Sequence, residues 1–127
     1  MLRKKILVVD DEFAINFLLE MVLKESYDLV TAKDGMEAIE RMSDDIDLVI
    51  LDLMMPKIDG FAFLEKLRSS LRTKDMPVII LSAKHSKDDV DRARRLGVID
   101  YVPKPFEPEL LRNKVDSFFA GRLDVKR

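Results

Sequence analysis

Acidic side chains follow two apolar runs of this chain, at the point where each run ends. Asp10 and Asp11 come directly after the run ILVV, which begins at Ile6. Asp52 follows the run LVIL, which begins at Leu48. Runs of this composition are typical of strands that are buried on both faces of a sheet. A carboxylate at the end of such a strand loses hydration, and this loss costs free energy unless a cation balances the charge. The spacing therefore predicts one shared acidic site.

Two further polar residues stand at the ends of later apolar runs. Ser82 follows VIIL, which begins at Val78, and Lys104 follows shortly after Tyr101-Val102. Because ligands bind at the carboxyl ends of strands in an open α/β sheet, we expect all of these side chains to converge there. The pattern predicts three acids, one hydroxyl and one amine around a single pocket.

Carboxylates in this number require either protons or a cation. Two carboxylates about 4 Å apart repel each other by roughly 4 kcal/mol at an effective dielectric constant of about 20. Oxygen ligands without nearby His or Cys favour a hard ion, and a site with few protein ligands and several waters suits Mg²⁺ better than Ca²⁺. The acids also lack the spacing of an EF-hand loop. The sequence therefore predicts a Mg²⁺ site.

Lys104 and Ser82 would then bind an anion that enters this site, Lys104 through its positive charge and Ser82 through a hydrogen bond. A phosphoryl group fits both side chains, because phosphoryl transfer depends on positioning and on neutralisation of the phosphoryl oxygens. A carboxylate can act as the nucleophile and form an aspartyl-phosphate. Asp52 is our candidate for that acceptor.

Five apolar runs alternate with five amphipathic or capped segments along the chain. This alternation predicts an α/β fold with a doubly wound five-stranded parallel sheet, right-handed crossovers and helices on both faces. The expected strands cover residues 6–9, 29–32, 48–51, 78–81 and 101–102. The expected helices run from about 12 to 24, 34 to 42, 59 to 67, 86 to 97 and 108 to 118. Phenylalanines and methionines at helical spacing are interpreted as core residues.

The composition argues against several other classes of protein. The chain has 127 residues, the size of one domain, and its formal net charge of −2 argues against direct nucleic-acid binding. It has no cysteine, which excludes disulfides, zinc-thiolate sites and thiol nucleophiles. The first apolar run is too short for a signal peptide or a membrane span. We therefore expect a cytoplasmic domain that does not enter a membrane.

Four motifs together resemble a known family. They are LVVDDE from Leu7, LDLMMPKIDGF from Leu51, PVIILSA from Pro77 and YVPKPFEPELL from Tyr101. Over residues 4–120 the chain is similar to the receiver domain of two-component response regulators. The resemblance implies a flavodoxin-like sheet with strand order 2-1-3-4-5, an order for which the chemotaxis member of this family is a standard example. It also implies a receiver domain at residues 1–121, with residues 122–127 as a tail or linker stub.

Carried over residue by residue, the resemblance makes Asp52 the phosphoacceptor. Asp11 and Asp52 would bind Mg²⁺ directly, together with the backbone carbonyl of Met54. Asp10 would act on the metal through a water molecule.

The resemblance also implies the residues of a switch. Ser82 and Lys104 would contact the phosphoryl oxygens, and Tyr101 would turn inward when Ser82 moves. The bond between Lys104 and Pro105 matches one that is usually cis in the family. Ser82 stands where threonine is also common, so the hydroxyl is kept while rotation about χ1 is less restricted.

The partners implied by the resemblance are proteins. A sensor histidine kinase or a histidine phosphotransfer protein would supply phosphohistidine, because His85, the only histidine, is interpreted as an exposed loop residue. The surface of the last two helices would then control a downstream protein target or a fused output domain. A phosphorylation-dependent homodimer through those helices, with Asp100 and Arg112 paired across it, is a further expectation. The domain would be a signalling switch that catalyses only its own phosphorylation and dephosphorylation.

Other interpretations of the same residues stay open. Asp10, Asp11 and Glu12 are also typical of a helix N-terminus, where acids interact with the macrodipole. A phosphatase-like enzyme can form aspartyl-phosphate, but Met54 stands where such enzymes usually carry a second acid. A flavin- or nucleotide-binding module would need a Gly/Ser/Thr-rich loop after the first strand, where this chain has acids. A binding module that works without phosphorylation is the remaining alternative.

Overall fold

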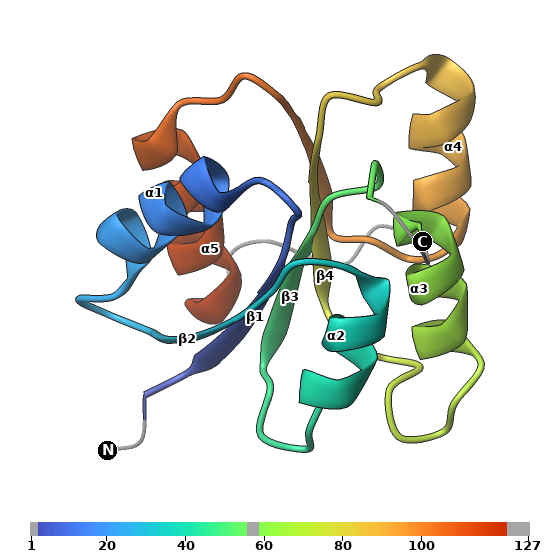
Figure 1. The fold of residues 1–127 in the computed structure, drawn as a ribbon, viewed down its shortest axis with the longest axis horizontal. Coiled ribbons are helices and arrows are strands. Elements are labelled where there is room, and N and C mark those ends of the chain that lie inside the picture. Colours follow the sequence, from blue (N-terminus) through green and yellow to red (C-terminus); the bar gives the residue numbers. More distant parts are fainter. Residues whose placement is uncertain (1–2, 56–58, 122–127) are drawn as a thin grey trace.

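The computed structural model describes residues 3–55 and 59–121, and within them five strands form one parallel sheet (Figure 1). The strands are β1 (Lys5–Val9), β2 (Asp28–Ala32), β3 (Leu48–Leu51), β4 (Val78–Ser82) and β5 (Asp100–Pro103). Their order across the sheet is β2-β1-β3-β4-β5, as the family resemblance implied. The order reverses beside β1 and β3, and in folds of this kind ligands bind outside the carboxyl ends of those strands.

Five helices alternate with the strands in the same described residues. They are α1 (Phe13–Leu23), α2 (Gly35–Arg41), α3 (Gly60–Arg68), α4 (Lys87–Arg95) and α5 (Pro108–Phe119). Helices α1 and α5 cover one face of the sheet, and α2, α3 and α4 cover the other (Figure 1). The predicted doubly wound α/β fold is confirmed. None of the helices in residues 3–55 and 59–121 combines the length and the apolar character that a membrane crossing requires.

Side chains of the central strands point alternately into two hydrophobic cores. Leu7 and Val49 belong to the core beneath α2, α3 and α4, and Ile6 and Ile50 belong to the core beneath α1 and α5. All four have at most 1% of their surface exposed. Because both faces of the sheet are covered, these strands appear in the sequence as unbroken apolar runs.

The fifth strand is longer than the sequence indicated. The prediction ended it before Pro103, whereas β5 includes this residue opposite Ser82. A proline is tolerated here because β5 is an edge strand and Pro103 occupies its last position. Lys104 follows at once, and its N–H donates to the carbonyl oxygen of Ser82 at 3.0 Å.

The interpretation of helically spaced phenylalanines and methionines as core is wrong for α1. Phe13, Phe17 and Met21 are 81%, 54% and 58% exposed. The helix instead buries Leu19 and Leu23, which lie on its other side. Periodicity indicated an amphipathic helix, but α1 has two apolar stripes, and only packing against the sheet decides which one is covered. In α3 both phenylalanines are buried, as expected.

Helix α3 begins directly beside the end of β3. Asp59 caps it as predicted, because its Oδ1 accepts the N–H of Ala62 at 2.8 Å. The N–H of Gly60 donates to the carbonyl oxygen of Leu53 at 3.1 Å. A Cβ atom at Gly60 would lie 2.4 Å from the carbonyl oxygen of Asp52 and 2.5 Å from Leu53 Cα. Only glycine lets the two backbones approach this closely, which ties α3 to the segment that carries Asp52.

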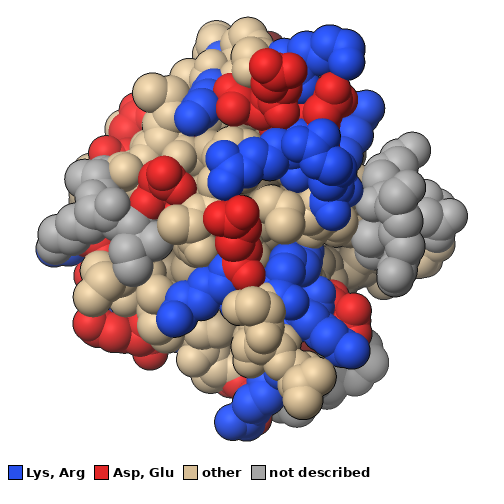
Figure 2. Space-filling model, turned by 90° about the vertical axis from the view of Figure 1, so that its right-hand side faces the viewer, with Lys and Arg blue, Asp and Glu red and all other residues tan. Residues whose placement is uncertain are grey.

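Helix α4 has acids in its first turn and arginines in its last turn, which complements the helix macrodipole. Ser86 caps its start by accepting the N–H of Asp89 at 3.2 Å, and Gly97, with φ of 75°, follows its end. Figure 2 views the side of the molecule formed by α3 and α4, where basic and acidic side chains are interspersed. One contact between the two helices joins Arg92 and Glu65 at 3.3 Å. This face is therefore mixed in charge rather than uniformly basic.

Candidate functional site

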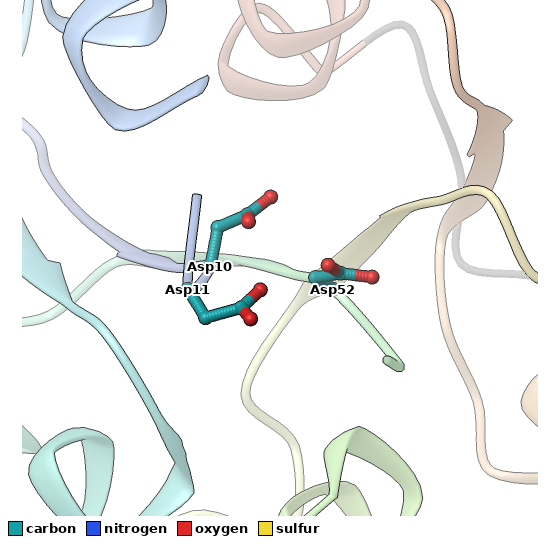
Figure 3. Close-up of side chains that lie close together, drawn as sticks. All are labelled: Asp10, Asp11 and Asp52. Atoms are coloured by element: carbon teal, nitrogen blue, oxygen red, sulfur yellow. The ribbon is translucent and has the colours of Figure 1, made fainter. Parts of the chain in front are cut away.

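Asp10, Asp11 and Asp52 lie together at the carboxyl edge of the sheet (Figure 3). Val9 pairs with Leu51, so the residues that follow these two positions emerge side by side. One carboxylate oxygen from each aspartate lies within 4.8 Å of the others. Asp10 and Asp52 are buried, with 2% and 3% of their surface exposed, and Asp11 is exposed. The structure therefore brings the three acids into one cluster.

Local turns hold two of these carboxylates in place. Oδ1 of Asp10 accepts the N–H of Glu12 at 2.9 Å, and Oδ1 of Asp52 accepts the N–H of Met54 at 3.0 Å. In each case the side chain bonds to the backbone two residues further on, as aspartate commonly does in turns. The second oxygen of each carboxylate is left to contact Lys104.

Lys104 reaches the same cluster from beyond the end of β5. Its Nζ lies 2.8 Å from Oδ2 of Asp10, 3.2 Å from Oδ2 of Asp52 and 2.9 Å from Oε1 of Glu12. Only 10% of the lysine side chain is exposed. The peptide bond between Lys104 and Pro105 is cis, as the resemblance implied. One ammonium group is thus shared by three carboxylates.

The charges of this cluster do not balance. Burial raises the pKa of Asp10 to about 6, although the hydrogen bond from Lys104 opposes the shift. Burial lowers the pKa of Lys104, but its hydrogen bonds with Asp10 and Glu12 outweigh that effect, and the pKa lies above its ordinary value. A buried carboxylate that resists ionisation this strongly, beside further acids, favours an additional cation at the site.

We expect Asp10→Asn to raise the free energy of unfolding at pH 7 in the presence of a chelator. The pKa of Asp10 is about 6 in the folded chain against an ordinary 3.8, so the folded state binds this proton more tightly. The resulting destabilisation is absent below about pH 4 and complete above about pH 6. The free energy of unfolding of the variant should therefore exceed that of the wild type by roughly 1–3 kcal/mol at pH 7 and by almost nothing at pH 4.

Urea unfolding of both chains at the two pH values measures this difference. Glu25→Gln removes an exposed acidic charge on the loop after α1 and is the matched control. A stability gain that is the same at both pH values would contradict the assigned burial of charge at Asp10.

Ser82 and Tyr101 both contact the backbone of Lys84. Ser82 is the last residue of β4 and is fully buried, and its Oγ accepts the N–H of Lys84 at 3.1 Å. The Tyr101 hydroxyl donates to the carbonyl oxygen of Lys84. Burial raises the pKa of Tyr101 to about 12, so the hydroxyl keeps its proton at neutral pH. The sequence singled out both side chains, but not their common contact with the backbone of Lys84.

A cavity of about 540 Å³ opens beside the acidic cluster. Asp11, Met54, Asp59 and Lys84 line it, together with Leu53 and Met55. The exposed Asp11 carboxylate faces this space, so a small anion or a side chain of another protein has access to the cluster.

Two residues at this site were missed by sequence reasoning. Glu12 was interpreted only as an acid near a helix start, yet its carboxylate contacts Lys104. Asn16 on α1 donates from Nδ2 to the carbonyl oxygen of Asp10 at 2.9 Å and so holds the end of β1. The signal for Glu12 was its place in LVVDDE, whereas a polar residue in a helix gives no comparable signal.

Asp100 and Arg112 each have a partner within the chain. Asp100 Oδ2 lies 2.6 Å from Lys114 Nζ, and Arg112 contacts Glu109 at 3.7 Å. Pairing of Asp100 with Arg112 across a dimer interface stays a prediction, and such a pair would have to compete with these contacts. His85, as expected, is exposed in the loop before α4.

Comparison with known proteins agrees with this geometry. The model of the response regulator receiver domain matches residues 6–116. The alkaline phosphatase synthesis transcriptional regulatory protein PhoP of Bacillus subtilis is 40% identical over 116 residues, which are 90% of this chain and 48% of PhoP. The chemotaxis protein CheY4 of Vibrio cholerae has a TM-score of 0.84 at 29% identity, over 91% of this chain and 98% of that one. The Mn²⁺-bound form of response regulator Rcp1 has a TM-score of 0.79 at 28% identity, over 98% and 99% of the two chains.

The fold and the acidic cluster define a doubly wound α/β domain with its site at the carboxyl edge of a parallel sheet. The family match identifies it further: the chain belongs to the response regulator receiver domains, the signalling domains of two-component systems. It spans about half the length of the curated relatives that it matches.

Proposed function

We propose that Asp52 of this receiver domain accepts a phosphoryl group from phosphohistidine on a partner protein. One observation carries the proposal: the buried Asp52 carboxylate lies beside Asp10 and Asp11 and 3.2 Å from the Lys104 ammonium. A carboxylate that attacks an anionic phosphoryl group needs positive charge nearby, because the two reactants repel each other. The Lys104 ammonium supplies such a charge at this site.

The residues present fit a divalent cation. The cluster offers carboxylate oxygens alone, and burial holds the pKa of Asp10 above its ordinary value even with Lys104 beside it. We propose that Asp11, Asp52 and the backbone carbonyl of Met54 hold Mg²⁺, with Asp10 acting through water. When bound, Mg²⁺ neutralises charge on the phosphoryl oxygens. The Mn²⁺-bound form of Rcp1 is a relative of the same fold with a divalent ion.

In the transfer step a carboxylate oxygen of Asp52 forms a bond to phosphorus as the bond from phosphorus to the donor nitrogen breaks. The nitrogen keeps the electron pair of that bond, and the ring leaves as neutral imidazole once it has bound a proton. Lys104 and Ser82 contact the phosphoryl oxygens and hold the group so that the Asp52 oxygen, the phosphorus and the leaving nitrogen lie in line. Positioning and charge neutralisation are the contributions that phosphoryl transfer chiefly needs.

The added negative charge then changes the surface through Ser82. The Ser82 hydroxyl is bonded to the Lys84 N–H, and Lys84 is bonded through its carbonyl to Tyr101. A shift of Ser82 toward the phosphoryl group therefore moves the loop before α4 and the ring of Tyr101 together. Coupling of this kind is typically about 1–3 kcal/mol, enough to change a partner's affinity tenfold or more.

We propose that this output surface, formed by α4, β5 and α5, controls a domain fused to the receiver or a separate protein. The transcriptional regulator PhoP is about twice as long as the region that it shares with this chain, which supports a fused output domain. For this chain we propose a receiver at residues 1–121 followed by a tail or linker stub. Residues 122–127 lie outside the described residues. A cytoplasmic location and the absence of steady turnover on small substrates belong to the same proposal.

The test is to map the phosphoryl group. The chain is incubated with Mg²⁺ and either phosphorylated histidine phosphotransfer protein or acetyl phosphate, and the acyl phosphate is trapped with borohydride. Reduction at position 52, identified by peptide mass, is the expected result. Reduction at any other aspartate, or steady hydrolysis of phosphate esters without trapping, would support one of the alternative functions instead.

The exposed stripe of α1 is our candidate for the surface that receives the donor protein. Phe13 and Phe17 stack with their ring centroids 6.3 Å apart, and α1 starts two residues after Asp11, at the border of the acidic site. Exposed apolar patches of this kind commonly mark protein interfaces. We expect Phe17→Ala to slow transfer from the phosphorylated protein by about tenfold or more, the range for an aromatic interface residue.

Transfer from acetyl phosphate should be unchanged in Phe17→Ala, because this small donor needs no docking surface. Leu71→Ala truncates another exposed apolar residue, one that follows α3, and serves as the control. Equal slowing with both donors would place the effect of Phe17 on the site itself and contradict the docking role.

A further inference from the structure

The ammonium group of Lys104 has its three N–H groups directed at three carboxylates. Two of the acceptors, on Asp10 and Asp52, belong to side chains with 3% exposure. The third is Oε1 of Glu12, at 2.9 Å, on a side chain that is 57% exposed. Glu12 is thus the one member of this set that stands in solvent at the rim of the acidic site.

The three contacts have different fates when Asp52 is phosphorylated. The contact between Lys104 and Asp52 is replaced by a contact between Lys104 and the phosphoryl group, because a phosphoryl oxygen takes the place of the carboxylate oxygen as acceptor. The contacts with Asp10 and Glu12 then fix the other two N–H directions, so the third N–H points to the position of the new group. Glu12 therefore restrains the ammonium from the solvent side, where water would otherwise compete for it.

The charge of Glu12 acts in a second way. With Asp10, Asp11 and Asp52 it makes four acids at this site, three of which contact the Lys104 ammonium. A small phosphodonor is itself an anion and must pass this negative rim without help from other contacts. A phosphohistidine protein brings a docking surface of its own and can offset the repulsion.

We propose that Glu12 is a specificity-determining residue of the phosphotransfer reaction: it positions Lys104 and selects against small anionic phosphodonors in favour of a phosphorylated protein. The inference rests on the proposed function of Asp52. For two unit charges about 7 Å apart, removal of one changes a rate by about threefold to eightfold at effective dielectric constants between about 40 and 80, and we expect an effect of this order per donor charge.

The two roles are separated by two variants. Glu12→Gln keeps an oxygen acceptor for Lys104 and removes the charge, so phosphorylation by acetyl phosphate at saturating Mg²⁺ should become about threefold to eightfold faster or more. Phosphoramidate, which carries less negative charge, should gain less, and the gain should shrink as salt screens the exposed carboxylate. Mg²⁺ binding, measured by calorimetry, should weaken by a similar factor because a nearby anion is gone.

Glu12→Ala removes the acceptor as well as the charge. The ¹H–¹⁵N signal of the Lys104 ammonium, which is visible when hydrogen bonds protect its protons from exchange, should persist in Glu12→Gln and be lost in Glu12→Ala. Glu20→Gln removes an equal charge from the exposed side of α1 further along the helix and is the matched control.

The outcomes decide the inference independently of the proposed function. If Glu12→Gln matches Glu20→Gln in donor preference, salt dependence and Mg²⁺ affinity, or if Glu12→Ala retains the Lys104 signal, the role of Glu12 is refuted while Asp52 still takes up the phosphoryl group. If no donor labels the wild-type chain at any aspartate, the proposed function of Asp52 is refuted, and the role of Glu12, which rests on it, is refuted with it.

Discussion

Asp52→Asn is expected to lower the rate of phosphorylation of this chain by at least about 100-fold, with protein and small donors alike. A loss of this size is typical when a group that takes part directly in the chemistry is removed. The amide keeps the size of the side chain and an oxygen that can accept the Met54 N–H. It lacks the anionic oxygen that attacks phosphorus, and its NH₂ group is a poor nucleophile. The variant therefore removes the reaction while the fold of the site is retained. Incorporation of labelled phosphate is the measurement.

The matched control for this variant is Asp59→Asn. Asp59 lines the same cavity, but its carboxylate caps α3, and asparagine caps a helix start about equally well. Its phosphorylation rate should stay within about a factor of three of the wild type, a change of less than 1 kcal/mol. Full labelling of Asp52→Asn would show that another group is the acceptor, and our assignment of the site would be wrong.

Gly60→Ala is expected to lower the free energy of unfolding by about 3–5 kcal/mol, at the upper end of the range for single substitutions. The new Cβ would lie 2.4 Å from the Asp52 carbonyl oxygen and 2.5 Å from Leu53 Cα. Both neighbours are backbone atoms, which cannot turn aside as a flexible side chain does. Either α3 separates from the end of β3 or the segment carrying Asp52 shifts, and both disturb packing of the core.

Urea unfolding measures the effect, and Gly97→Ala is the control. Gly97 has a φ of 75°, but the nearest atom to an added Cβ is Arg68 Nε at 3.8 Å, so only backbone strain of about 1–2 kcal/mol applies. We also expect the surviving folded fraction of Gly60→Ala to bind Mg²⁺ more weakly, because the backbone at Asp52 and Leu53 has moved. Equal losses in the two variants would mean that the close approach at Gly60 is relieved at little cost.

Sequence reasoning predicted the fold and the members of the acidic cluster for related reasons. A strand covered on both faces must be apolar throughout, so a polar residue at its end is conspicuous, and Asp10, Asp52 and Ser82 were found in this way. Parallel strands place those ends along one edge, so proximity followed from the order of the runs. The expected ends of the elements were within two residues of those observed, since caps such as Asp34, Asp59 and Ser86 mark helix starts locally.

Features that depend on distances between separate elements were not accessible in this way. The sequence contained both apolar stripes of α1, but whether Phe17 or Leu19 is buried depends on how the helix rests on the sheet. Glu12 and Lys104 are 92 residues apart in the chain, and nothing local indicates that their side chains meet. Likewise, Ser82 and Tyr101 were singled out individually, while their common contact with Lys84 appeared only in the structure.

The sequence by itself determined the strand-and-helix order, the burial of the central strands and the types of chemical group at the sheet edge, because these follow from apolar periodicity and from local capping. The tertiary structure alone decided which carboxylates share the Lys104 ammonium, which face of α1 stays in solvent and how closely α3 approaches Asp52. The physical reason is that hydrogen bonds and close packing act over a few ångströms, and only the folded backbone brings groups from distant parts of the chain within that range.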